Sequence, residues 1–95
     1  MTQHFTVLLQ MEELKQQLKQ QIIAALNLED LTPADIDDAA PLFGEGLGLD
    51  SIDALELILL MERQYGIKLN NAAEARPIMG SINQMAEYIA ANRKK

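Results

Sequence analysis

Cysteine is absent from this sequence of 95 residues, and histidine occurs once, as His4. The lack of thiols excludes disulfide scaffolds, thiolate metal sites and cysteine nucleophiles. Nucleophilic catalysis by a serine needs an imidazole held beside it, and His4 stands near an N-terminus that we expect to be frayed. We therefore expect a protein that is not an enzyme. No calcium-loop spacing of aspartates is present either, and we expect no metal site.

Aromatic residues and long hydrophobic runs are also scarce. Hydrophobic residues make up 48% of the chain but only 4% is aromatic, so the core must consist mainly of Leu, Ile, Ala and Met. This composition favours packed helices over a sheet. The longest apolar run, Leu57 to Met61, is far shorter than the ~20 residues that span a bilayer. Residues 1–10 show no secretory signal. We expect one all-α domain over residues 1–95, monomeric and cytoplasmic, with no membrane span.

Basic residues are missing from the whole stretch between Glu29 and Glu62, and the formal net charge is −6. This balance opposes binding to nucleic acid or anionic lipid and suits a basic protein partner. The acidic segment over residues 29–62 is either a solvated acidic face or a docking surface for a protein, and charge alone does not decide between the two. Its acidic residues are Glu29, Asp30, Asp35, Asp37, Asp38, Glu45, Asp50, Asp53, Glu56 and Glu62.

Apolar residues at three- and four-residue spacing predict a first helix that begins between Thr6 and Met11 and stops near Asn27. Residues 1–10 are expected to be a loosely ordered extension. The periodic positions of this helix are Val7, Met11, Leu14, Leu18, Ile22 and Leu26. A short capped turn is predicted at residues 32–35, and a long loop, pinned by its leucines and Phe43, at residues 39–50.

Further along the chain, a second helix is predicted from Ser51 to Tyr65, ended by Gly66. An extended link and a short helical turn over residues 71–76 follow. A final helix is capped by Ser81, with residues 93–95 complementing its dipole. The expected fold is a small antiparallel bundle of three main helices plus one short helix, with a long first loop.

The junction between the long loop and the second helix presents Asp50 and Ser51 together. One reading is that either residue simply caps the helix. The other is that the glycine-containing loop presents Ser51 for chemistry. With no base in the chain, such a serine can be modified only by another enzyme. A phosphodiester there would meet free backbone N–H groups and the positive end of the helix dipole.

The second helix carries two apolar stripes when residues are placed about 100° apart. One stripe, suited to the core, comprises Ala54, Leu57, Ile58, Met61 and Tyr65. The other comprises Ile52, Leu55 and Leu59 and is flanked by carboxylates. This second stripe is either an exposed binding patch or part of one unusually wide buried face.

At these residues the sequence resembles the acyl carrier proteins. The resemblance rests on Leu49-Asp50-Ser51-Ile52-Asp53 after a Gly-Leu loop, followed by an acidic, apolar helix, and it extends from about Met11 to Ala91. It implies that Ser51 carries 4′-phosphopantetheine, attached from coenzyme A by a phosphopantetheinyl transferase. The thiol of that arm would carry acyl groups as thioesters. Within this resemblance, Asp50 before Ser51 favours a carrier of fatty-acid or polyketide type. Since the sequence shows no fused domain, we expect a discrete carrier. Departures from the common pattern at residues 43–46, 63 and 75–79 favour a specialised polyketide or lipid cargo.

The same resemblance implies a surface read by acyl-transferring and ketosynthase-type enzymes with basic docking patches. Its members would be Ile52, Leu55, Leu59, Glu56 and Glu62, supported by Asp50 and Asp53. The alternative is an unmodified acidic helical adaptor that binds a basic partner through residues 51–65. In an adaptor, Ser51 could be replaced without loss of function.

Overall fold

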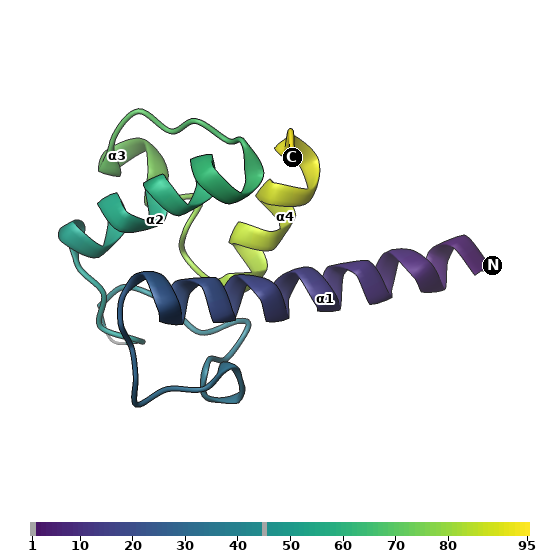
Figure 1. The fold of residues 1–95 in the computed structure, drawn as a ribbon, viewed down its shortest axis with the longest axis horizontal. Helices are drawn as coiled ribbons and strands as arrows, with labels where there is room; N and C mark the ends of the chain where they lie inside the picture. The colour runs from purple at the N-terminus through teal and green to yellow at the C-terminus, as the bar shows by residue number, and fades with distance from the viewer. Residues whose placement is uncertain (1, 45) are drawn as a thin grey trace.

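A computed structural model describes residues 2–44 and 46–95, with side chains from Leu9 onward. The elements in chain order are α1 (Thr2–Ala25), a 3-10 turn η1 (Pro33–Asp35), α2 (Ser51–Tyr65), α3 (Ala72–Ala75) and α4 (Ile82–Asn92). In Figure 1, α2 runs opposite to α1, and α4 crosses α1 steeply. The expected all-α bundle of three main helices, one short helix and a long first loop is confirmed.

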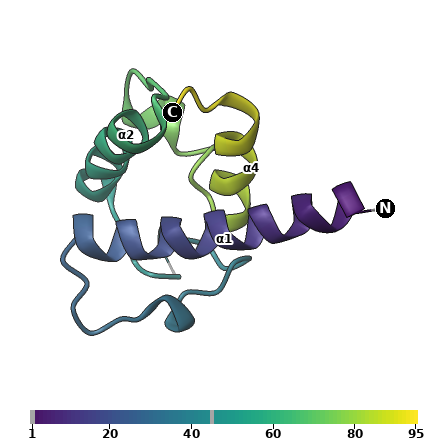
Figure 2. The ribbon, with the colours of Figure 1, turned by 45° about the vertical axis from the view of Figure 1, so that its right-hand side comes forward.

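The start of α1 differs from the prediction. The helix begins at Thr2, ahead of the Thr6–Met11 range, because no proline or glycine interrupts helical hydrogen bonding before Met11. Its first half projects past the other helices (Figures 1 and 2). The periodic position Val7 lies outside the described side chains. The helix stops where expected, with Asn27 in the left-handed region at φ 54°.

The core lies where α1 packs against α4 and α2, and α2 packs against α3 (Figure 2). Burying these Leu, Ile and Met side chains is the main favourable term in folding, at about 1.5–3 kcal/mol for each fully buried one. The largest side chains with almost no exposure are Tyr65, Leu18, Ile22, Leu42, Leu57, Met61, Met79, Ile82, Met85 and Ile89.

The long first loop is held to the bundle at several points. Leu42 is buried, and its N–H donates to the carbonyl of Gly80 at 3.0 Å, ahead of α4. Asp38 forms an ion pair with Lys19, a largely buried residue of α1. The expected turn at residues 32–35 is present, with the Thr32 N–H and hydroxyl both donating to Asp35. These contacts hold residues 38–42 against α1 and the segment before α4. Glu45 lies outside the described residues.

Candidate functional site

The last part of the loop, residues 41–49, closes on itself before α2 begins. Phe43 and Leu49 form an isolated parallel bridge, and the Leu49 N–H donates to the Leu42 carbonyl at 3.2 Å. A Cβ atom added at Gly46 would lie 1.5 Å from the Pro41 carbonyl oxygen. Only glycine permits this close approach of residue 46 to the Pro41 carbonyl. Gly46 therefore helps to set the path of the loop that leads to Ser51.

Asp50, rather than Ser51, caps α2. Its Oδ1 accepts from the N–H groups of Ile52 and Asp53 at 3.0 and 3.2 Å. In return the Asp50 N–H donates to Asp53 Oδ2 at 3.0 Å, which completes a reciprocal capping box. The sequence left the capping residue open between Asp50 and Ser51, and the structure assigns it to Asp50.

Ser51 is therefore the first helical residue and is exposed. Among the hydrogen bonds of the described residues, none involves its Oγ. Ser81, the other serine in the chain, is buried, and its Oγ accepts from the Gln84 N–H at 3.2 Å. Ser51 is thus the serine whose hydroxyl is available to another protein.

The backbone environment of Ser51 differs from the expectation in one respect. A phosphodiester on Ser51 was expected to meet free N–H groups at the helix start. Two of these groups already donate to Asp50, and the Ala54 N–H donates to the Asp50 carbonyl at 3.0 Å. The Ser51 N–H donates to no group among the described residues, so the helix start still offers an anion this one N–H and its dipole, the latter worth about 0.3–1 kcal/mol.

The two apolar stripes of α2 lie in different environments. All five residues of the first stripe are buried. In the second, Ile52 is 72% exposed, Leu55 53% and Leu59 41%. Exposure at this level excludes the single wide buried face and leaves an apolar patch on the surface. Leu60, which was assigned to neither stripe, is also buried.

Carboxylates surround this exposed stripe. Asp50, Glu56 and Glu62 are exposed, and Asp53 is half-buried within the capping box. The residues of the expected partner surface therefore follow α2 from its Asp50 cap, next to Ser51, to Glu62 in its last turn. Asp50 and Asp53 also stabilise the start of α2 through the capping box, in addition to contributing negative charge to this surface.

The single histidine of the sequence belongs to a segment far from Ser51. The N-terminal end of α1, which carries His4, lies at the opposite end of the molecule from the start of α2 (Figure 1). No group of three or more His, Cys, Asp or Glu residues able to hold a metal ion occurs among the described residues. Within the same residues, no helix is long and apolar enough to cross a membrane.

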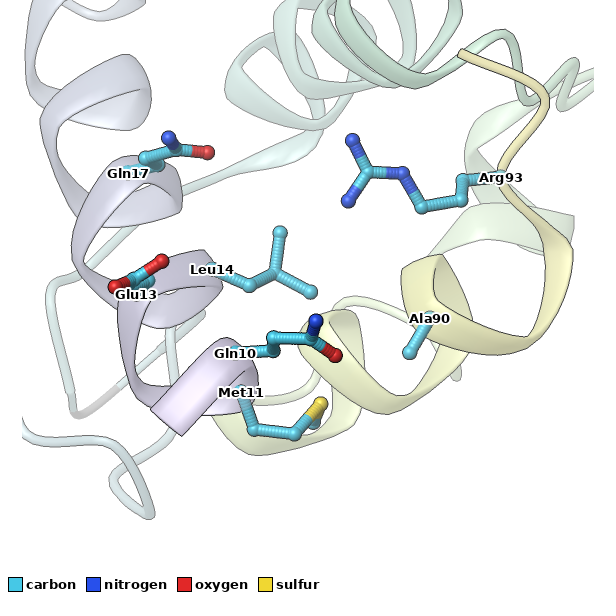
Figure 3. A pocket seen from close by; sticks show the side chains of 7 residues that line it. All are labelled: Gln10, Met11, Glu13, Leu14, Gln17, Ala90 and Arg93. Atoms are coloured by element: carbon cyan, nitrogen blue, oxygen red, sulfur yellow. The ribbon is translucent and has the colours of Figure 1, made fainter. Parts of the chain in front are cut away.

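A groove of about 510 Å³ lies between α1 and the end of α4. Figure 3 shows Arg93 extending from the α4 side toward Leu14 and Gln17 of α1. The groove is lined by residues of α1, Ala90 and Arg93, and by none from α2 or the serine loop. It is therefore separate from the site at Ser51.

Comparison with known protein families agrees with this geometry. The family model described as "Phosphopantetheine attachment site" matches residues 16–89, which include the serine loop, α2 and the first eight residues of α4. Members of this family carry a covalently attached 4′-phosphopantetheine group and are not themselves catalytic. An exposed, unengaged serine at a helix start suits such a group, since the attachment atom must be reached by a second protein. The chain belongs to the phosphopantetheine-attachment family, which is the family of the acyl carrier proteins.

Proposed function

We propose that this chain is an acyl carrier protein in which Ser51 Oγ holds the 4′-phosphopantetheine arm. The observation that carries the proposal is that Asp50 takes over capping, so Ser51 is exposed at the helix start with its hydroxyl uncommitted. The arm supplies the thiol that this cysteine-free chain lacks, and so allows acyl groups to be held as thioesters. The chain acts as a substrate shuttle and not as an enzyme.

Attachment requires a phosphopantetheinyl transferase that supplies its own base, because no imidazole of this chain lies near the start of α2. The contribution of the chain is positioning. The loop closed by Gly46 and Pro41 places Ser51, and the capping box keeps the first turn of α2 formed around it. The helix dipole favours the negative charge of the phosphodiester.

The acyl-transferring and ketosynthase-type enzymes that use the cargo would dock on the exposed stripe. Ile52, Leu55 and Leu59 provide an apolar centre. The carboxylates Asp53, Glu56 and Glu62 would meet a basic patch on the enzyme, which gives fast, salt-dependent association. The resemblance to acyl carrier proteins implies cargo of fatty-acid, polyketide or specialised-lipid type.

The test is intact-mass spectrometry after incubation with coenzyme A, Mg²⁺ and a broad-specificity phosphopantetheinyl transferase. We expect one phosphopantetheinyl group on the wild-type chain and none on Ser51→Ala. Ser81→Ala is the matched control, since it removes the only other serine, and it should still be modified. No mass gain with a transferase that modifies a known carrier would refute the proposal and favour the unmodified acidic adaptor.

A further inference from the structure

Charge is distributed unevenly along α2. Asp53 and Glu56 lie in its first half, after the Asp50 cap, and its last turn has Glu62 and Arg63 side by side. Lys95 adds a cation near Arg63, since its Nζ donates to the Arg63 carbonyl at 3.0 Å, and the Lys94 backbone N–H donates to the Tyr65 carbonyl at 2.8 Å. At 1.5 Å per residue, Asp50 and Arg63 are about 20 Å apart along the helix.

Arg63 also borders a groove that continues from the exposed stripe. The groove, of about 360 Å³, runs between the end of α1 and α2, and Leu59 belongs to both the groove and the stripe. On its α1 side it is lined by Gln21, Ala24 and Ala25, and Gln21 donates to Gln64 of α2 at 3.4 Å. On its α2 side both Glu56 and Arg63 line it, with Glu56 two turns nearer to Ser51. Glu62 does not line it, because residue 62 lies about 100° around the helix from Arg63.

The guanidinium of Arg63 has no partner within the described part of the chain. The ion pairs found there join Lys15 and Lys19 to Glu12 and Asp38. Near the end of α2, Arg93 lies over the Tyr65 ring and Lys95 binds a backbone carbonyl. Arg63 is exposed, so its planar fork of N–H donors, which matches a carboxylate in two-point geometry, faces the outside.

We propose that the enzyme docking on α2 inserts an acidic side chain into the groove between α1 and α2, where it pairs with Arg63. The matching face of that enzyme then has an apolar centre, basic groups opposite Asp53, Glu56 and Glu62, and a carboxylate opposite Arg63. This proposal rests on the proposed function for its choice of an enzyme as partner. Its consequence is a fixed direction of docking along α2. Direction matters because Ser51 stands at one end of the helix only.

The probes for a test are two synthetic amphipathic helical peptides with the same apolar face. The all-basic peptide has Lys at both ends, and the mixed peptide has Lys at one end and Glu at the other. Each carries a nitroxide label at the end that differs between the two. Binding to the full ¹⁵N-labelled chain is followed at low ionic strength, both as Kd and as broadening of amide signals by the label.

We expect the labelled Glu end of the mixed peptide to broaden amides at the end of α2 and the end of α1, and not those around Ser51. In Arg63→Glu this preference should disappear. The Kd of the mixed peptide, relative to that of the all-basic peptide, should rise about fivefold, as expected for exposed charge pairs at an interface. Lys68→Glu is the matched control: it makes the same charge change at an exposed residue outside α2 and should leave this Kd ratio unchanged.

Three results would overturn the proposal: equal broadening at both ends of α2 in the wild type, the same Kd ratio in Arg63→Glu as in Lys68→Glu, or no binding of either peptide. Amide spectra of the free variants establish that each is folded. The peptides need no modification of Ser51. The mass experiment therefore tests the carrier function separately, and the two proposals can fail independently.

Discussion

Replacing Asp50 by Ala should destabilise the start of α2 by about 1 kcal/mol. The substitution removes the acceptor of the Ile52 and Asp53 N–H groups. The Asp53 carboxylate keeps its bond from the backbone N–H at position 50, which alanine also has, so only the Asp50 half of the capping box is lost. Because Asp50 is exposed, water replaces the lost bonds, and the cost stays below the roughly 3 kcal/mol of a buried unpaired group. For a domain of this size about 1 kcal/mol lowers Tm by about 4–8 °C.

The measurement is urea unfolding followed by circular dichroism, with Asp50→Asn as the matched variant. Asn keeps an oxygen in the position of Oδ1 and caps about as well as Asp. It loses only the interaction of the charge with the helix dipole, about 0.3–1 kcal/mol. The expected order of unfolding midpoints is wild type, Asn, then Ala, at constant m. The rate of Ser51 modification should follow the same order, because fraying of the first turn displaces the serine. Equal midpoints for Ala and wild type would refute the assignment of Asp50 as the cap.

The remaining predictions concern packing, the loop and pH. Leu57→Ala should lower the free energy of unfolding, measured in urea melts, by about 2–5 kcal/mol. Leu55→Ala, on the exposed stripe of the same helix, should change it by less than about 0.5 kcal/mol. Equal effects of the two substitutions would contradict the two-stripe arrangement. Gly46→Ala should cost about 1–3 kcal/mol in the same assay, since the new methyl would overlap the Pro41 carbonyl. Burial raises the pKa of Tyr65 above its ordinary value of 10.0, against the smaller opposing effect of its hydrogen bond to Gln21. The pKa of Tyr65 is higher in the folded than in the unfolded chain, so the associated stability is complete below pH 10 and is lost as the pH rises through the folded-state pKa. Ultraviolet titration of a Tyr88→Phe variant should show Tyr65 ionising above pH 10. Ionisation at or below pH 10 would contradict its burial.

Much of the fold could be predicted from local signals. The second helix has the predicted bounds because both of its ends are encoded locally: an Asp cap precedes it, and Gly66 follows in the left-handed conformation at φ 69°. The exposed stripe could also be predicted, since helical periodicity separates it from the core stripe. The start of α1 was predicted wrongly because its residues contain no comparable stop or cap signal.

Features that depend on packing between elements could not be predicted from the sequence. Leu60 is buried, and the groove beside it is lined by both α1 and α2, so both depend on how the two helices are placed together. Residues 93–95 were expected to complement the dipole of the last helix. In the structure, the Lys94 backbone N–H and the Lys95 Nζ donate to carbonyls at the end of α2. Contacts between segments so far apart in sequence leave no periodic signal in either segment.

At the start of α2, Asp50 caps the helix and Ser51 presents its hydroxyl, and these separate roles explain why an aspartate precedes the serine. A serine that capped its own helix would have its hydroxyl oriented toward the backbone N–H groups and would be less accessible to a modifying enzyme. With Asp50 as the cap, that hydroxyl is not needed for the helix. The arrangement has an electrostatic cost, since the Asp50 carboxylate stands next to the position that a phosphodiester would occupy and offsets part of the dipole's attraction. The start of α2 is therefore better suited to presenting Ser51 to a second protein than to binding a free phosphate tightly.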